Sequence, residues 1–238
     1  MEDFKTQITL TDKLKTGAKA KLPLPLLLKM LHRGEMDDNV TILFTSGSEK
    51  DPKAVQLTHK NINANIHTVT ELFQLNEKDV MLASLPYFHV FGLTVNHWLP
   101  LLTGMKSVAY ANPLDFKKVV EIIRNNNVNL VIGTPIFLNG YLKKSQPGDF
   151  QSVRITIAGA DKVPEHLREG FMKAHNVEVF EGYGTTETSP VISVNYPGNN
   201  KPGSIGKPLP DVKVKITDLE SGKELPRNSE GKILVKGD

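Results

Sequence analysis

The stretch that decides the fold covers residues 153–187 and reads VRITIAGADKVPEHLREGFMKAHNVEVFEGYGTTE. Strands are predicted over residues 153–158 and 177–180, with a helix between them over residues 164–175. Pro164 suits the first turn of that helix, where a missing backbone N–H costs nothing. A strand, a helix and a second strand in this order are typical of one unit of an α/β protein.

The same alternation continues toward the N-terminus. Further strands are predicted over residues 40–44, 80–85, 107–110 and 128–132, the first of them buried. Further helices are predicted over residues 58–73, over residues 92–103, and after the N-cap Asp115. Strands that alternate with helices favour an α/β fold with a mostly parallel sheet flanked by helices. Such sheets bind ligands at the carboxyl ends of their strands.

Changes in composition and in the pattern of apolar residues divide the chain into three regions. Residues 1–38 are expected to be an irregular N-terminal connector, residues 39–190 an α/β subdomain, and residues 191–238 a truncated, β-rich subdomain. Proline and glycine become dense after residue 190. Apolar residues then alternate over residues 212–216, which favours short antiparallel strands.

The segment 19–33 (KAKLPLPLLLKMLHR) mixes basic residues with leucines. Pro23 and Pro25 argue against a helix through its first part, and a short basic amphipathic helix is expected from Leu26 onward. We favour a connector that packs its leucines on a core. Contact with a membrane surface or with another domain is the alternative.

Composition excludes several classes of function. The net charge of +3, from 29 Lys and Arg against 26 Asp and Glu, is too small to argue for a nucleic-acid partner. The chain has no cysteine, which excludes a disulfide scaffold, a thiolate zinc site and a cysteine nucleophile. A polar N-terminus and the lack of a long apolar run predict a cytoplasmic protein, with the cytoplasmic face of the membrane as an alternative for a longer polypeptide.

A hydroxyl-rich loop over residues 45–53 (TSGSEKDPK) follows the first predicted strand. Its three hydroxyls, one glycine and two lysines can offer donors and positive charge to phosphate oxygens. It lacks the Gly-Lys-Ser/Thr ending of a Walker loop, which disfavours a P-loop NTPase. Taken alone, the loop is as readily interpreted as a polar turn.

A second motif over residues 182–187 (GYGTTE) follows the strand 177–180. Two glycines that flank Tyr183 allow close approach of a flat ligand, and Glu187 offers the hard oxygen that Mg²⁺ prefers. The alternative is a glycine-rich turn with a solvated glutamate.

Two weaker motifs also follow predicted strands. Residues 86–92 (PYFHVFG) place His89 among aromatic side chains that can line a tunnel for an apolar substrate, although such a histidine is more often a hydrogen-bonded core residue. Residues 158–161 (AGAD) are uninformative by themselves.

Together, these motifs resemble the adenylate-forming superfamily of acyl-CoA synthetases, peptide-synthetase adenylation domains and luciferases. The family's Ser/Thr-Gly-rich loop ending in Pro-Lys-Gly corresponds to residues 45–54, and its Tyr-Gly-x-Thr-Glu motif is matched in full by residues 183–187. Residues 231–237 (GKILVKG) resemble a later strand of the family, so the resemblance covers residues 40–238. Residues 45–49, 88–95, 181–187 and 201–204 carry a finer resemblance, to the bacterial acyl-[acyl-carrier-protein] synthetase part of bifunctional 2-acylglycerophosphoethanolamine acyltransferases.

The resemblance implies a two-step reaction. A fatty acid attacks the α-phosphate of ATP, pyrophosphate leaves, and a pantetheine thiol then takes the acyl group from acyl-AMP. The phosphate-binding residues implied by the family are Thr45, Ser46, Gly47, Ser48, Lys53 and Thr186. The other implied roles are Mg²⁺ binding by Glu187, adenine binding by Gly159, Ala160, Tyr183 and Gly184, and contact with the acyl carboxylate by His89. The implied catalytic residues are Lys53, His89, Thr186 and Glu187.

Some positions depart from the family pattern. Lys50 and Ala54 replace two glycines of the loop. Asp238 follows the strand 231–237 directly and is not expected to be the family's ribose-binding aspartate, which lies further downstream. The family's small C-terminal domain, with its lysine for adenylation, is also missing. We therefore expect a fragment that is inactive alone.

The expected partners are ATP, Mg²⁺, a fatty acid, and acyl carrier protein or coenzyme A, with acyl carrier protein favoured and no nucleic acid. Residues 39–190 would then be the nucleotide-binding subdomain. The alternatives are another acyl- or aryl-CoA ligase and a non-catalytic module that binds a nucleotide or a carrier protein.

Overall fold

A computed structural model describes residues 8–30, 34–45 and 52–238. The chain separates into two compact units, Met1–Asp38 and Asn39–Asp238. Over the described ranges, every helix is too short or too polar to cross a membrane.

The described residues of the first unit form the helices α2 (Leu10–Ala20) and α3 (Leu24–Met30), where we expected an irregular connector. The sequence signal for α2 is a capping box: the Thr9 hydroxyl accepts from the Asp12 N–H at 3.2 Å, and the Asp12 carboxylate accepts from the Thr9 N–H at 3.0 Å. Pro25 falls in the first turn of α3, where it interrupts no helical hydrogen bond. Within this unit, no residue of the two helices is buried.

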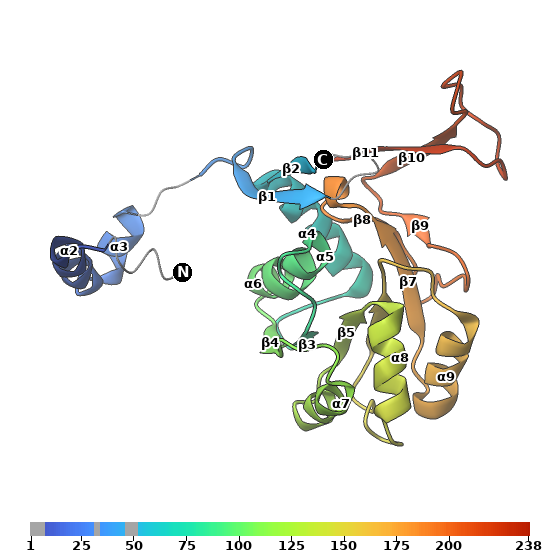
Figure 1. The fold of residues 1–238 in the computed structure, drawn as a ribbon, viewed down its shortest axis with the longest axis horizontal. Coiled ribbons are helices and arrows are strands. Elements are labelled where there is room, and N and C mark those ends of the chain that lie inside the picture. The colour runs from blue at the N-terminus through green and yellow to red at the C-terminus, as the bar shows by residue number, and fades with distance from the viewer. Residues whose placement is uncertain (1–7, 31–33, 46–51) are drawn as a thin grey trace. The chain divides into compact units, whose positions relative to one another are not determined.

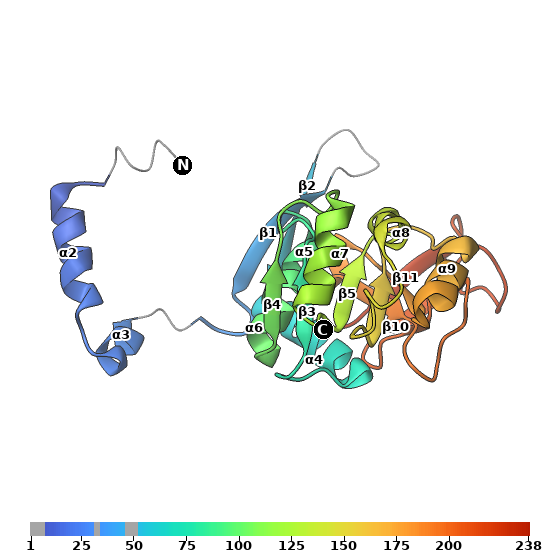
Figure 2. The ribbon, with the colours of Figure 1, turned by 90° about the horizontal axis from the view of Figure 1, so that it is seen from below.

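The second unit is built on a seven-stranded sheet, as far as the described residues show, with the order β4-β3-β5-β6-β7-β8-β9 (Figures 1 and 2). The strands are β3 (Val80–Ala83), β4 (Lys106–Ala109), β5 (Leu130–Gly133), β6 (Ile155–Ala158), β7 (Val179–Gly184), β8 (Val191–Val194) and β9 (Lys207–Pro208). Pairing is parallel from β4 to β7 and antiparallel from β7 to β9. The predicted α/β fold with a mostly parallel sheet is confirmed.

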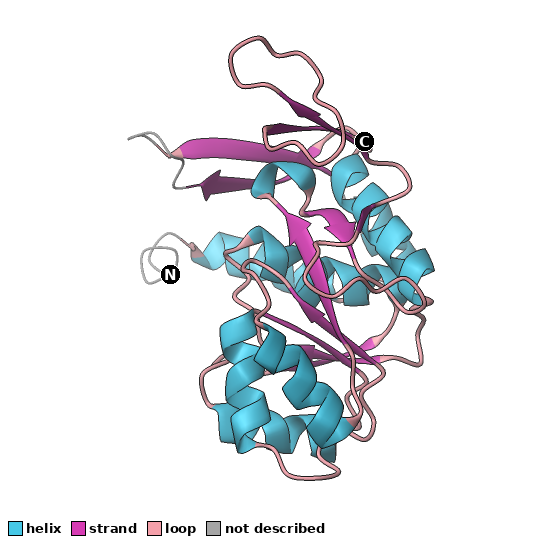
Figure 3. Cartoon of the chain, turned by 90° about the vertical axis from the view of Figure 1, so that its right-hand side faces the viewer, coloured by secondary structure: helices cyan, strands magenta, loops and turns pink. Residues whose placement is uncertain are grey.

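Helices cover both faces of this sheet (Figure 3). One face carries α4 (His59–Phe73), α5 (Val90–Gly92), a π-helical segment (Leu93–Trp98) and α6 (Leu99–Thr103). The other face carries α7 (Phe116–Asn125), α8 (Pro135–Lys144) and α9 (Glu165–His175). Strand β5 shows the division, because Leu130 and Ile132 belong to the first core and Val131 to the second. Burial of alternate residues on both faces makes the central strands apolar throughout.

The N-caps predicted for two helices are confirmed. The Thr58 hydroxyl accepts from the Asn61 N–H at 3.2 Å and begins α4. The Asp115 carboxylate accepts from the Lys118 N–H at 3.3 Å and begins α7. Each cap satisfies a backbone donor that the first helical turn leaves unpaired.

Strand β1 (Asn39–Thr45) is not the buried strand that we expected. Within the described residues it pairs antiparallel with β2 (Lys53–Thr58) in a hairpin separate from the main sheet. Because the hairpin is covered on one face only, Ile42 is 52% exposed and Phe44 is 73% exposed.

The expected single helix over residues 92–103 is divided by the π-helical segment. The boundary expected at residue 190 does not divide the sheet, because β8 pairs with β7 and β9 pairs with β8. Among the described strands after β9, β10 (Lys213–Thr217) and β11 (Lys232–Lys236) form a separate antiparallel pair, as the alternation predicted.

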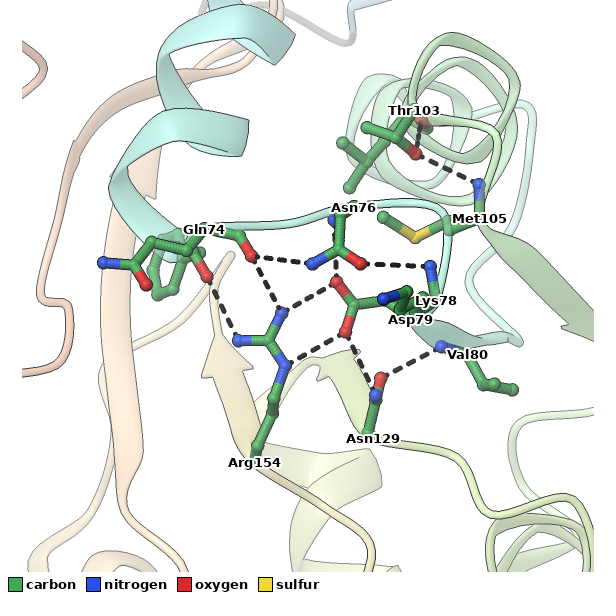
Figure 4. Close-up of polar contacts among 11 residues, drawn as sticks. Gln74, Asn76, Lys78, Asp79, Val80, Thr103, Met105, Asn129 and Arg154 are labelled. Carbon is green, nitrogen blue, oxygen red and sulfur yellow. Dashed lines mark hydrogen bonds and ion pairs between the residues drawn. The ribbon is translucent and has the colours of Figure 1, made fainter.

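An ion pair fixes the edge of the sheet where the parallel strands begin (Figure 4). The Arg154 guanidinium donates to both carboxylate oxygens of Asp79, at 2.7 and 3.0 Å. The Asn129 amide and the Asn76 N–H donate to the same carboxylate at 3.0 and 2.9 Å. Arg154 also donates to the backbone carbonyls of Phe73 and Gln74, at 3.1 and 3.3 Å. The starts of β3, β5 and β6 are therefore tied to the end of α4.

Burial by itself would raise the pKa of Asp79. The hydrogen bonds from Arg154, Asn76 and Asn129, together with the charge of Arg154, outweigh burial and hold the pKa below its usual value. The ionised carboxylate therefore stabilises the folded state above the unfolded pKa of about 3.9, and this contribution is lost as the pH falls through the lower folded value.

We predict that Asp79→Asn lowers the free energy of unfolding at neutral pH by roughly 1.5–3 kcal/mol, the range for hydrogen bonds to charged groups. Urea unfolding at several pH values measures this loss. The difference from the wild type should begin to shrink below about pH 4, where the unfolded chain's carboxylate becomes protonated, and should be lost below the lower pKa of the folded state. Asp37→Asn, at an exposed aspartate outside the network, is the control. Equal losses at neutral and acidic pH would contradict the assignment.

Candidate functional site

A cavity of about 400 Å³ lies at the carboxyl ends of β5, β6 and β7. Its polar wall includes Thr45, Asn65, His89, Thr94, Gly159, Ala160, Gly182, Tyr183, Gly184, Thr185, Thr186 and Glu187. Its apolar wall includes Ile66, Val69, Phe73, Val90, Phe91, Val95, Leu99, Ile132, Ile157, Pro190, Val191 and Val194. The volume lies within the range of roughly 300–1,000 Å³ that is usual for small-molecule sites.

Most of the site residues predicted from the sequence line this cavity. Thr45, at the end of β1, and Glu187, in the turn after β7, border the same cavity. Ser46, Gly47 and Ser48 lie outside the described residues. Lys53 is the first residue of β2 and stands opposite Thr45 in the hairpin, but it is exposed and is not part of the cavity wall.

The short 3-10 helical turn Thr186–Thr188 carries the two polar residues expected to meet phosphate and metal. The Thr188 hydroxyl donates to the Pro190 carbonyl at 2.6 Å, and the Thr185 N–H donates to the same oxygen at 3.0 Å. These bonds close the turn on itself, which leaves Thr186 and Glu187 to face the cavity.

Side chains from the opposite wall hold this turn in place. The Asn65 amide on α4 donates to the Val191 carbonyl at 2.8 Å and accepts from the Val191 N–H at 3.3 Å. The Thr94 hydroxyl in the π-helical segment donates to the Ser189 carbonyl at 3.3 Å. Sequence reasoning missed both residues. A polar residue on the otherwise apolar face of a predicted helix was the available signal for Asn65.

The loop after β6 forms another part of the wall. Ala160 adopts φ +70°, in the left-handed region that few residues other than glycine occupy. The base of the loop is fixed by Glu181, which accepts from the Val163 N–H at 3.2 Å, and by Arg168, which donates to the Val163 carbonyl at 2.7 Å. The backbone of Gly159 and Ala160 is thus held at the cavity, where the resemblance predicted an adenine contact.

His89 is exposed at the cavity wall, so the alternative of a buried core histidine is wrong. Its Nδ1 accepts from the Phe91 N–H at 3.1 Å and caps α5. A neutral imidazole that accepts at Nδ1 carries its proton on Nε2. His89 can therefore donate one hydrogen bond to a ligand oxygen.

Glu187 also fits a bound Mg²⁺. Glu187 is exposed and lines the polar end of the cavity together with Thr185 and Thr186. Mg²⁺ in nucleotide sites takes one or two protein carboxylates and completes its shell with phosphate oxygens and water. Glu187, at the polar end of the cavity, would meet that requirement where a bound nucleotide supplied the phosphate oxygens.

The apolar half of the cavity was only partly predicted. The aromatic motif contributes Val90 and Phe91, as a substrate tunnel requires. A second apolar side comes from Ile66, Val69 and Phe73 of α4, which sequence reasoning assigned to no site. Their helical spacing marks a core-facing stripe but does not distinguish a packed core from a cavity wall.

The fold and the site define a ligand-binding α/β protein whose site is polar at the sheet edge and apolar further in. Residues 4–238 match the family model described as AMP-binding enzyme. The chain belongs to this family.

Named relatives agree with that membership. The chain is 30% identical over 207 residues to a long-chain-fatty-acid–CoA ligase of Escherichia coli O6:H1, which covers 84% of this chain and 37% of that protein. It is 32% identical to the ligase of the same name from Bacillus subtilis, with 84% and 36% covered. The O-succinylbenzoate coenzyme A synthetase MenE of B. subtilis, in complex with ATP and magnesium ion, has a similar structure, with a TM-score of 0.78, 29% identity, and 85% and 42% covered. The chain thus spans well under half the length of these relatives.

We predict that Gly184→Ala destabilises the protein by about 1–3 kcal/mol, the usual cost of overpacking. A Cβ at Gly184 would overlap the Pro190 carbonyl that closes the turn. Gly133→Ala is the matched control, because a Cβ there meets Leu138 at an ordinary 3.5 Å. Urea unfolding of both variants measures the difference, and equal stabilities would contradict the tight turn.

Proposed function

We propose that this chain is the ATP-binding part of a ligase that activates a fatty acid as acyl-AMP. The observation that carries the proposal is a single cavity with a polar end, at Thr45, Thr186 and Glu187, and an apolar end against α4. A substrate with a charged head and a hydrocarbon tail fits such a cavity. Relatives named as long-chain-fatty-acid–CoA ligases support this substrate class.

The proposed first step is attack of a fatty-acid carboxylate oxygen on the α-phosphorus of ATP, with pyrophosphate as the leaving group. The hydroxyls of Thr45 and Thr186 donate to phosphate oxygens, where negative charge builds up in the transition state. Glu187 would hold a Mg²⁺ ion, which would supply positive charge to neutralise part of that charge. The fixed position of the turn means that these groups need no rearrangement during the reaction.

His89 and the adenine-binding residues have positioning roles in the proposal. The Nε2–H of His89 donates to the substrate carboxylate and directs it toward the phosphate. Tyr183 and the backbone of Gly159, Ala160 and Gly184 form the surface for adenine. Ser46, Gly47, Ser48 and Lys53 remain proposed phosphate ligands on the strength of the sequence resemblance alone.

The proposed second step moves the acyl group from AMP to a pantetheine thiol. The chain has no cysteine, so the thiol comes from a partner. The names of the relatives support coenzyme A. Acyl carrier protein is the finer proposal and rests on the motifs described above.

We predict that Glu187→Gln, made in the protein at its natural length, slows fatty-acid-dependent ATP–pyrophosphate exchange by about 100-fold, the usual effect of one lost transition-state contact. ATP affinity, measured by calorimetry, should change much less. Glu169→Gln, at an exposed glutamate on α9, is the control. A wild-type protein that binds ATP but supports no exchange would instead be a non-catalytic binding module.

We predict acyl transfer to holo acyl carrier protein at a higher kcat/KM than to coenzyme A. Both acceptors are offered to the natural-length protein with ATP and radiolabelled decanoate. Faster transfer to coenzyme A would reject the finer proposal while leaving fatty-acid activation in place.

A further inference from the structure

The cavity extends along helix α4, which borders it from Asn65 to Phe73. Asn65 marks the polar end, because it bonds to Val191 just beyond the turn that carries Glu187. Phe73 is the last residue of the helix, eight positions further on, which corresponds to about 12 Å along the helix axis.

Phe73 lies toward the opposite edge of the sheet from Glu187. Its carbonyl accepts a hydrogen bond from Arg154, which immediately precedes β6, whereas the polar motifs follow the ends of the parallel strands. Helical side chains lean toward the N-terminus of their helix, so the Phe73 ring leans back toward the polar end. The side chain lines the cavity and yet is only 3% exposed.

The strands also show how deep the cavity reaches below the edge of the sheet. Ile132 and Ile157, next to the carboxyl ends of β5 and β6, line the cavity. Leu130 and Ile155 are two residues earlier on the same strands and belong to the same core, but they lie outside the cavity wall. The cavity thus ends one side-chain layer below the sheet edge, on the side where Phe73 is anchored.

We infer that Phe73 is the floor of the acyl pocket and sets the longest acyl chain that the protein accepts. The inference rests on the proposed function, because it takes the cavity to hold a fatty acid. An extended chain advances about 3.3–3.6 Å over three bonds, and the Phe73 ring leans back into the run of about 12 Å, so the pocket holds at most roughly ten bonds of an alkyl chain. The substrate class is therefore a straight fatty acid of medium length, with its methyl end against the Phe73 ring.

Two contacts make this floor rigid. The Phe73 ring packs edge-to-face on Phe180 of β7, with 6.1 Å between ring centroids. This contact prevents the ring from moving toward the sheet. Its backbone is held by Arg154, which Asp79 holds in turn. Arg154 is thus a positioning residue for chain length, although it lies outside the cavity wall.

The test is ATP–pyrophosphate exchange by the natural-length protein with straight fatty acids from hexanoate to palmitate. The wild type should peak near octanoate or decanoate and then lose roughly tenfold or more in kcat/KM for each further methylene that the floor excludes. Phe73→Ala should move the peak to longer acids by two or more carbons, and Phe73→Trp to shorter ones. Phe73→Leu, the milder replacement, should move it in the same direction as Phe73→Ala if that variant does not fold.

Phe171→Leu is the matched control, because Phe171 is fully buried in the core on the other face of the sheet. Its chain-length profile should match the wild type. Arg154→Gln should make the fall in kcat/KM at the long-chain end of the profile less steep. A loss of stability alone would not change the chain-length profile in this way.

The outcomes separate the two proposals. The role of Phe73 is overturned if all the Phe73 variants keep the wild-type chain-length peak in the exchange assay. It is also overturned if the wild type uses palmitate as efficiently as decanoate. Either result leaves the proposed activation of a fatty acid unaffected. Absence of exchange with every fatty acid rejects the proposed function, and the role of Phe73 with it.

Discussion

The parallel register of β5, β6 and β7 is the constraint on which the site depends. Ile132 pairs with Ile157, which pairs with Phe180, so β5 and β6 end at the same level and β7 continues past them to Gly184. Parallel strands must return through a connection on a face of the sheet, and each strand therefore meets its following turn at one edge. Residues far apart in the sequence, such as His89 and Glu187, border one cavity for this reason.

The sequence was sufficient for features that depend on local pattern. The α/β fold, the caps at Thr58 and Asp115 and the turns after β6 and β7 follow from apolar periodicity and from short polar motifs. Helix α8 was missed because Gly140 in its interior weakens the helical signal, although Pro135 suits its first position. Gly140 is required there, since a Cβ would collide with the Phe116 ring, and that neighbour is brought to it only by the folded chain.

Errors in the site have the same physical origin. The apolar run of β1 is equally compatible with a central strand and with a one-sided hairpin, and only its pairing with β2 distinguishes the two. Asn65 and Phe73 were missed as site residues because their spacing describes a helix face but not what lies opposite that face. The boundary expected at residue 190 followed a change in composition, whereas β8 continues the sheet and Val191 and Val194 line the cavity.

Helix α4 connects the two ends of the cavity. Near its middle, Asn65 fixes the segment that follows the glutamate turn, and at its end Phe73 is tied through Arg154 to the starting edge of the sheet. The regular rise of an α-helix sets the axial distance between Asn65 and Phe73. Under the proposed function, a fatty acid that spans this distance would have its carboxylate placed by the position of its methyl end. One helix would then select both the chain length and the geometry of the reacting carboxylate.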